Sequence, residues 1–318
     1  MTNEVKLEIV AAAHEYMGLH KINATELYKL SGVNTSYLSN ILSGVFTAQA
    51  GGAEVIIADK YFTNIAEAVG FSTKRQYWQH VMTKEFLEII ALLKEAKEAQ
   101  GVKTIVVDSG AGKTYAVNQF KKRNPLNTYV ITMHSLVGIT DLFADLIGQL
   151  GISSKGSQAY RRSQLIIKLR DIKKNGGMPI VIIDEAENMN TGMMKMLKGF
   201  YDGLNGYCSI VLVGTAQLWD VMFKAKDKDA QSGPQFWRRF KPGTRHIRLE
   251  QRLEKRFEPF FSALGITDKG LRKLLCEVCD NYGELHDYLE PALRAADAKG
   301  AEIGMDLAFF RLYHNMPD

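Results

Sequence analysis

The chain lacks the features that would place it in a membrane or outside the cell. No apolar stretch approaches the roughly 20 residues that span a bilayer. The first residues, with Glu4, Lys6 and Glu8, lack the basic-then-apolar pattern of a signal peptide. The chain has only three cysteines, an odd number that argues against a disulfide framework. These absences favour a soluble, cytoplasmic protein with no membrane partner.

The chain also has no large excess of positive or negative charge. The 40 Lys and Arg residues face 35 Asp and Glu residues, which gives a formal net charge of +5 over 318 residues. A chain of this length can hold one large core and a small additional domain. Because the net charge is modest, its distribution along the chain is more informative than its total.

A glycine-rich loop directly after an apolar run is the most informative feature that is present. Residues 107–114 read V-D-S-G-A-G-K-T. The two glycines can turn backbone N–H groups toward a polyphosphate, the lysine can reach the terminal phosphates, and the threonine can offer its hydroxyl to Mg²⁺. The predicted phosphate-binding residues are Ser109, Gly110, Ala111, Gly112, Lys113, Thr114 and Tyr115. The loop predicts a nucleoside triphosphate site; the alternative is an ordinary strand-to-helix turn with two convenient glycines.

One position departs from the full G-x-x-x-x-G-K-[ST] pattern. Val107 stands where the first glycine is expected. A β-branched residue prefers extended backbone angles. We therefore expect Val107 to lengthen the preceding strand by one residue before the loop turns.

Two further apolar runs end in polar residues. Residues 179–185 read P-I-V-I-I-D-E, the form of a central parallel strand whose carboxyl end faces a ligand. Asp184 is placed to hold Mg²⁺, and Glu185 to orient or deprotonate an attacking water. The run at 209–214 ends in Thr215, which could contact the γ-phosphate or the water if this strand lies between the other two. Taken alone, the acidic pair would indicate a solvated turn and Thr215 a helix N-cap.

Strand-like runs alternate with helical patterns through the middle of the chain. Strands are expected at 128–132 and at the fifth position, 246–249, and helices at 115–123 and 141–150. This alternation predicts an α/β fold with a parallel sheet in a three-layer core and right-handed crossovers.

The phosphate loop, the D-E pair and the polar strand tip, in this order, resemble the AAA+ ATPases. The resemblance covers roughly residues 80–318. It implies a Mg²⁺-dependent ATPase in which Lys113 and Thr114 belong to Walker A, Asp184 and Glu185 to Walker B, and Thr215 is sensor 1. Thr114 and Asp184 would hold the Mg²⁺. The expected domains are a helix-turn-helix domain at 1–72, an AAA+ core at 73–250 and a helical lid at 251–318.

Within this superfamily the chain is similar to the transposition target-selection ATPases typified by the B protein of phage Mu. The similarity rests on a short helical front end, I-I-D-E-A-E at Walker B and a compact lid. It implies a protein that oligomerises on double-stranded DNA as a ring or helical filament, selects target sites and activates a DDE-type transposase. The alternatives are a helicase loader or replication initiator, a helix-turn-helix regulator with a degenerate nucleotide site, and a signalling ATPase.

Basic residues gather in two segments. Residues 155–174 carry seven Lys and Arg residues against one acid, Asp171, and a second cluster spans 238–256. Such clusters can bind DNA phosphates, although each is equally consistent with a solvated helix face. The DNA-binding residues predicted in the first cluster are Arg161, Arg162, Lys168 and Lys173. In the second, the family resemblance implies an arginine that reaches a neighbouring subunit's γ-phosphate, with Arg238 preferred and Arg239 next.

The first 72 residues are expected to form an all-α domain. The first helix is expected at 5–17, and a second one begins after a cap at Asn23 or Thr25. Two more helices are expected at 34–42 and at 54–69, with a flexible turn at 49–52. The second and third helices resemble the helix-turn-helix of lambda-repressor-like domains. The residues predicted there to face DNA include Thr35, Ser36, Tyr37 and Asn40. Balanced charge leaves a protein-docking module as the alternative.

Three smaller expectations concern the rest of the chain. A helix is expected at 76–100, with Trp78 as an anchor or a stacking partner of adenine. In the lid, His286 occupies the position where the resemblance implies a sensor 2 arginine, and Arg294 could substitute. Cys276 and Cys279 form a C-x-x-C in a helical pattern and are expected to pack in a core rather than bind zinc.

Overall fold

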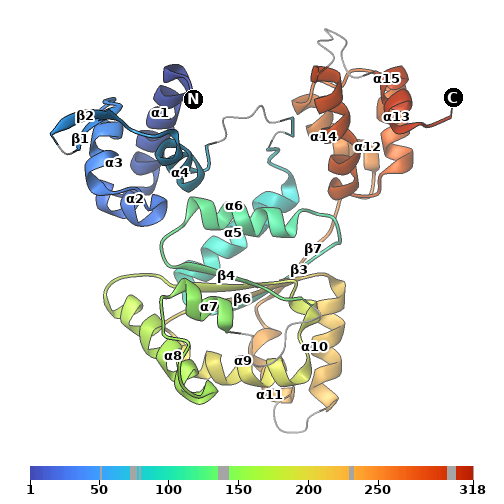
Figure 1. The fold of residues 1–318 in the computed structure, drawn as a ribbon. Coiled ribbons are helices and arrows are strands. Elements are labelled where there is room, and N and C mark those ends of the chain that lie inside the picture. The colour runs from blue at the N-terminus through green and yellow to red at the C-terminus, as the bar shows by residue number, and fades with distance from the viewer. Residues whose placement is uncertain are drawn as a thin grey trace. The chain divides into compact units, whose positions relative to one another are not determined.

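The computed structural model describes residues 1–50, 52–71, 77–78, 80–134, 143–228, 233–298 and 306–317. The chain divides into two compact units, Met1–Gln76 and Tyr77–Asp318, and most of their elements are labelled in Figure 1. Within the described residues, every helix is too short or too polar to cross a bilayer.

The first unit contains four helices and a β-hairpin among its described residues. Its elements are α1 (Asn3–His20), α2 (Ala24–Ser31), α3 (Thr35–Leu42), β1 (Thr47–Ala50), β2 (Ala53–Ile56) and α4 (Asp59–Val69). Asn23 caps α2 as predicted, because its side chain accepts from the Glu26 N–H while the Glu26 carboxylate accepts from the Asn23 N–H. Gly32 ends α2 at a φ of +66°, and the Asn34 side chain caps α3.

The prediction that the first unit is all helical was wrong. Strands β1 and β2 form an antiparallel hairpin that pairs Thr47 with Ile56. Gly52 adopts a φ of +82° in the turn, and the Thr47 hydroxyl donates to Glu54 across the strands. A short apolar run cannot be assigned to helix or strand by periodicity alone. The expected helix at 54–69 therefore begins five residues later, at Asp59.

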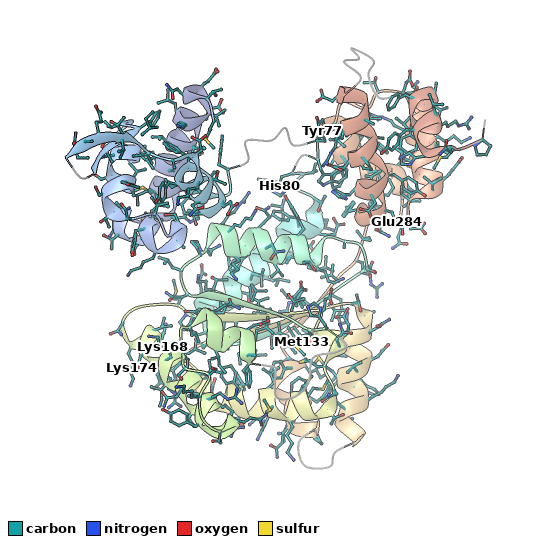
Figure 2. The ribbon with its side chains drawn as sticks, viewed as in Figure 1. Tyr77, His80, Met133, Lys168, Lys174 and Glu284 are labelled. Atoms are coloured by element: carbon teal, nitrogen blue, oxygen red, sulfur yellow. The ribbon has the colours of Figure 1, made fainter. Side chains whose placement is uncertain are left out.

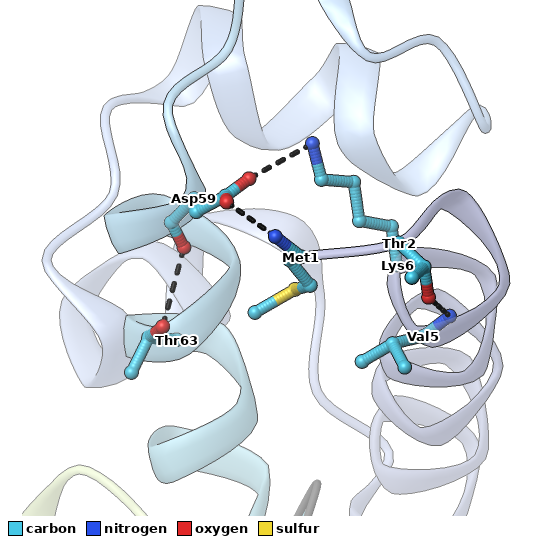
Figure 3. A network of polar contacts seen from close by, with 6 residues as sticks. All are labelled: Met1, Thr2, Val5, Lys6, Asp59 and Thr63. Carbon is cyan, nitrogen blue, oxygen red and sulfur yellow. Dashed lines mark hydrogen bonds and ion pairs between the residues drawn. The ribbon is translucent and has the colours of Figure 1, made fainter.

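A buried lysine connects α1 to α4. Lys6 is only 5% exposed, and its ammonium lies 2.9 Å from one Asp59 oxygen and 4.7 Å from the centre of the Phe62 ring. The other Asp59 oxygen accepts from the ammonium of Met1 at 2.7 Å (Figure 3). The Met1 ammonium, followed by Lys6, holds the pKa of Asp59 below its usual value. This network ties the start of α4 to α1.

The second unit is built on a five-stranded parallel sheet in the order β4-β5-β6-β3-β7. The strands are β3 (Val102–Val107), β4 (Thr128–Thr132), β5 (Ile180–Asp184), β6 (Ser209–Gly214) and β7 (Thr244–Ile247). Strand β4 has the predicted bounds, and β7 begins two residues earlier than predicted. Strand β6 lies between β5 and β3, as the interpretation of Thr215 required.

Alternating side chains of the central strands enter two separate cores. Ile180 and Ile182 face the core shared with α5 and α6, whereas Val181 and Ile183 face the core shared with α7 to α11. Figure 1 shows these helices on the two faces of the sheet, which gives the predicted three layers. The helices are α5 (Lys84–Ala99), α6 (Lys113–Arg123), α7 (Ala144–Gln149), α8 (Gln158–Lys174), the 3₁₀ turn η1 (Ala186–Asn188), α9 (Thr191–Leu204), α10 (Ala216–Lys228) and α11 (Gly233–Phe240).

The C-terminal part of the second unit is helical, as predicted for a lid. It comprises α12 (Leu253–Ala263), α13 (Lys269–Val278), α14 (Tyr282–Ala298) and α15 (Leu307–His314). Its apolar side chains join the core that covers α5 and α6. The helix predicted at 76–100 was too long: α5 begins at Lys84, because the Thr83 side chain accepts from the Phe86 N–H and caps it. The first part of the helix predicted at 141–150 lies outside the described residues.

Candidate nucleotide-binding site

The glycine-rich loop has the backbone that a phosphate requires. Val107 is the last residue of β3 and is 1% exposed, so it extends the strand as predicted. Gly110 and Gly112 have φ values of +71° and +79°, a region that residues with a Cβ rarely adopt. Helix α6 begins at Lys113, directly after the loop, and its free N–H groups and dipole favour an anion there.

The loop borders a cavity of about 640 Å³, a size that suits a nucleotide. Nearly all of the predicted nucleotide-site residues line it, namely Ser109, Gly110, Ala111, Gly112, Lys113, Thr114, Tyr115, Glu185 and Thr215. The structure thus brings together side chains from the ends of three strands. The two predicted arginines, Arg238 and Arg239, do not line it.

Asp184 lies beneath this cavity and is 1% exposed. One carboxylate oxygen accepts from the Glu185 N–H at 3.0 Å, and the other, Oδ2, has no hydrogen-bond partner among the described residues. Burial raises the pKa of Asp184, while the Thr114 hydroxyl, the Glu185 amide and the Lys113 ammonium act in the opposite direction. A buried carboxylate with one free oxygen needs a cation or a hydrogen-bond donor.

These residues fit a magnesium ion. Mg²⁺ is usually held by one or two carboxylates, waters and substrate phosphates rather than by a full protein cage. In the part of the chain that the structure describes, no three His, Cys, Asp or Glu side chains converge on a metal site. The free Asp184 oxygen and the adjacent Thr114 hydroxyl therefore match a Mg²⁺ that is completed by phosphate oxygens and water.

Glu185 has a left-handed backbone, with a φ of +52°. Strained residues of this kind persist where the surrounding structure holds them, and they cluster at functional sites. Its carboxylate accepts from Asn188 Nδ2 at 3.4 Å, and it lies 4.0 Å from Nδ1 of His134. Both neighbours escaped the sequence analysis, because neither belongs to a recognisable motif.

Thr215 lies at the tip of β6, and its hydroxyl is buried without a hydrogen-bond partner among the residues described. A capping threonine would accept from an N–H of α10, so its hydroxyl is not used as the cap. Instead, the Thr215 N–H donates to Oε1 of Glu187 at 3.2 Å. Glu187 also lines the cavity and was missed, although the second glutamate of I-I-D-E-A-E was a visible signal.

Aromatic side chains form the opposite wall of the cavity. Trp78 stacks on Phe260 of the lid at 5.0 Å and meets His286 edge-on at 5.0 Å. Trp78 thus both anchors the lid and lines the cavity. His80 (labelled in Figure 2) shares a 2.9 Å hydrogen bond with the Tyr115 hydroxyl, and burial lowers its pKa.

His286, which stands where the family resemblance implies sensor 2, lines the cavity. Arg294, the proposed substitute, does not line the cavity. It pairs with Glu290 and lies 5.9 Å from the centre of the Tyr77 ring. The expectation that Arg294 replaces sensor 2 is therefore not supported by its position.

The lid touches the phosphate loop directly. The Tyr282 N–H donates to the Gly110 carbonyl at 3.2 Å. A Cβ on Gly110 would lie 2.3 Å from the side chain of Asn281, so only glycine leaves room for this contact. The Tyr282 hydroxyl donates to Glu85, which is 3% exposed. These contacts link the start of α14 to the loop and to α5.

The two candidate arginine fingers differ in their surroundings. Arg239 donates to Asp202 at 2.7 Å and is thereby held within its own subunit. Arg238 is exposed and makes no ion pair within the described part of the chain. This difference supports the preference for Arg238.

The predicted DNA-contacting residues of α8 lie beside its buried stripe, since Arg161 precedes Leu165 and Lys173 follows Leu169 by one helical turn. Leu165 and Leu169 are fully buried, whereas Arg162 and Lys168 are exposed and Arg161 and Lys173 are half-buried. Figure 2 labels Lys168 and Lys174 on this helix. By contrast, Arg170 turns inward, where its Nε donates to the Gly203 carbonyl. Of the four predicted residues, Arg162 and Lys168 are thus the exposed ones, whereas Nε of Arg161 is buried.

The predicted DNA-contacting residues of α3 are divided. Thr35 and Ser36 are exposed. Tyr37 packs edge-on against Tyr61 at 5.0 Å, and Asn40 Nδ2 donates to the carbonyl of Thr47 in the hairpin. The first two are free to contact a partner, whereas the last two hold the unit together.

The two cysteines of the C-x-x-C motif lie in the lid's core. Cys279 is 1% exposed, and burial raises its pKa to about 12. Cys276 packs against the same apolar cluster. A thiolate is therefore disfavoured here, in agreement with the packing interpretation.

Comparison with known proteins agrees with this geometry. Residues 96–222 match a family model described as an AAA domain. The DNA transposition protein B of the Mu-like prophage FluMu from Haemophilus influenzae is 23% identical over 217 residues, which cover 68% of this chain and 72% of that protein.

Solved structures show the same fold at low sequence identity. The ORC2 protein of Aeropyrum pernix is 14% identical with a TM-score of 0.52, and the match covers 76% of this chain and 69% of ORC2. Cdc6p of Pyrobaculum aerophilum is 13% identical with a TM-score of 0.50, and the match covers 73% of this chain and 66% of Cdc6p. The chain therefore has the AAA+ P-loop fold and is similar to AAA+ ATPases of the transposition protein B type, which confirms the predicted resemblance.

Proposed function

We propose that this protein is an ATP-dependent DNA-binding AAA+ protein that oligomerises on duplex DNA, selects target sites and activates a DDE-type transposase. It would act in the cytoplasm. One observation carries the proposal: Lys113, Glu185 and Thr215 line a single cavity of about 640 Å³ above the buried, half-unpartnered Asp184. The similarity to a DNA transposition protein supports the assignment of this activity to DNA transposition.

The geometry supports ATP hydrolysis by positioning and electrostatics. The loop amides and the N-terminus of α6 would hold the phosphates, with Lys113 on the terminal ones. Thr114 and Asp184 would hold Mg²⁺, which supplies charge neutralisation on the phosphate oxygens. Glu185 would take the proton of the attacking water, and Thr215 lines the same cavity.

Oligomerisation would complete the site. Arg238 is exposed and does not line the cavity of its own subunit, as expected for an arginine that serves a neighbour. A planar guanidinium suits this task because it spreads charge over the phosphate oxygens. We infer a ring or helical filament in which bound ATP joins subunits.

DNA would be held by many subunits together. Each contributes the exposed Arg162 and Lys168 of α8 and the exposed Thr35 and Ser36 of α3. A weakly basic subunit binds DNA weakly by itself, but linked sites gain avidity without new contacts. ATP would thus control DNA binding through assembly.

Electron microscopy of the full chain with duplex DNA tests this proposal. Ordered assemblies are expected with a non-hydrolysable ATP analogue and not with ADP. Lys113→Ala should abolish them, because the phosphates lose their cationic partner. Assemblies that form equally well without nucleotide would refute the proposal. A helicase loader or replication initiator has the same ATPase parts, and copurification of a helicase instead of a transposase would favour that alternative.

A further inference from the structure

Glu187 bridges the ends of the two strands that carry the hydrolytic residues. It lies in η1, which follows β5 and Glu185, and its Oε1 accepts from the Thr215 N–H at the tip of β6 at 3.2 Å. This hydrogen bond spans 28 positions in sequence. The contact fixes the tip of β6 relative to the acidic strand.

The other oxygen of Glu187 has no hydrogen-bond partner among the residues that the structure describes. Oε2 is buried, and no described residue donates to it. The Thr215 hydroxyl is buried and unpartnered in the same way, and both residues line the nucleotide cavity. Unpartnered polar atoms of two neighbouring residues that line one cavity are each a site for a hydrogen-bonded water.

A glycine makes room for this carboxylate. A Cβ on Gly214 would lie 2.4 Å from Oε2 of Glu187 and 3.0 Å from Leu218 Cβ. Any side chain at 214 would push the carboxylate away from the strand tip. Gly214 therefore permits the position of Glu187, although its φ does not require a glycine.

We propose that Glu187 positions the attacking water. It holds Thr215 in place through Oε1 and accepts a hydrogen bond from the water through Oε2, while the Thr215 hydroxyl makes a second contact to that water. This inference rests on the proposed ATPase function and adds a residue to it. Glu185 remains the proton acceptor.

The reaction then balances without another reactant. The water oxygen forms a bond to the γ-phosphorus as the bond from that phosphorus to the β–γ bridging oxygen breaks. The electron pair of the broken bond leaves with ADP, and the proton of the water passes to Glu185. Glu187 keeps its negative charge throughout and acts by orienting the water.

Steady-state ATP hydrolysis by the full chain, with Mg²⁺ and duplex DNA, tests the role of Glu187. Glu187→Gln keeps an acceptor for the Thr215 N–H but offers the water an amide donor instead of an acceptor. We expect kcat to fall about 10- to 100-fold, the loss typical of a misplaced reactant. KM and the equilibrium affinity for a fluorescent ATP analogue should stay within about twofold, because the phosphate contacts are intact.

Gly214→Ala provides a second route to the same defect. The added Cβ displaces Oε2 while the carboxylate remains present, so a similar loss in kcat is expected. If both changes act through one contact, the double variant should lose no more than the single variants. Glu98→Gln, exposed on α5, is the matched control and should hydrolyse ATP normally.

The outcomes separate this inference from the proposed function. If the wild type hydrolyses ATP and Glu187→Gln has the same kcat, the proposed role of Glu187 is wrong, but the proposed ATPase function is not affected. A loss of ATP affinity that equals the loss of kcat would also overturn it, because Glu187 would then only support the fold. A wild-type chain that binds ATP but never hydrolyses it would overturn the ATPase proposal and this inference with it.

Discussion

Asp184→Asn should make the protein more stable without nucleotide and unable to use Mg²⁺. Asp184 is 1% exposed, and its Oδ2 has no partner in the described structure. Burial of this charge raises its pKa, so the ionised form at neutral pH costs folding free energy. Asparagine has nearly the same shape and no charge.

The gain should be modest but measurable. Leaving a buried donor or acceptor unpaired costs about 1–3 kcal/mol, and a charged group costs more than a neutral amide. We therefore expect the variant to gain about 1 kcal/mol, which corresponds to roughly 2–4 °C in Tm for a unit of this size. Because the pKa is raised, the advantage should be largest above that raised value and should shrink as the pH falls through it toward the usual 3.8.

Tryptophan fluorescence during thermal unfolding in EDTA reports this gain. All three tryptophans, Trp78, Trp219 and Trp237, lie in the second unit, so the signal follows that unit alone. Asp220→Asn, exposed on α10, is the control for loss of a charge and should not change Tm.

Magnesium and ATP should reverse the order of stability. At a ligand concentration about 100 times Kd, the wild type gains roughly 2.7 kcal/mol, and Asp184→Asn should lose most of that gain. A variant that melts below the wild type in EDTA at pH 7.5, or that gains as much from Mg²⁺ and ATP, would refute this account of Asp184.

Two further predictions concern charge elsewhere. Replacing Lys168 and Lys173 by Gln should reduce the slope of log K against log salt for duplex DNA binding by about 2 in all. Each DNA phosphate that a lysine no longer neutralises contributes about 0.9 to that slope. The same replacement at Lys84 and Lys94 on α5 should leave the slope unchanged. The lowered pKa of Asp59 means that its contribution to stability is present above about pH 4 and is lost as the pH falls through the lowered value. Asp59→Asn should therefore speed hydrogen exchange in α1 and α4 at pH 7 but not at pH 2. An equal effect at both pH values would contradict the link between the ionisation of Asp59 and stability.

Local sequence motifs were sufficient to predict the glycine-rich loop and the strands around it. A β-branched Val107 extends a strand, two glycines turn a loop, and apolar runs of five or six residues bury as central strands. Each of these depends on the backbone preferences of a few neighbouring residues. For this reason β4 and the end of β3 followed from the sequence, whereas the convergence of Lys113, Asp184 and Thr215 depends on β6 lying between β5 and β3.

The hairpin β1–β2 could not be predicted from local sequence patterns. The run at 53–57 is short and apolar, so its pattern suits a helix or a strand equally. Its pairing with residues 47–50 decided the outcome. Propensity is weak in such a segment, and tertiary pairing overrides it.

What the sequence determined by itself is the strand-and-loop pattern that forms a triphosphate site. Only the tertiary structure decided that Glu187 reaches Thr215, that Asn281 lies against Gly110, and that Arg239 pairs with Asp202 while Arg238 stays exposed. These contacts join residues from 28 to 171 positions apart, as for Thr215–Glu187 and Asn281–Gly110. Backbone preferences act over a few residues, whereas such distant neighbours are set by how whole helices pack on the sheet.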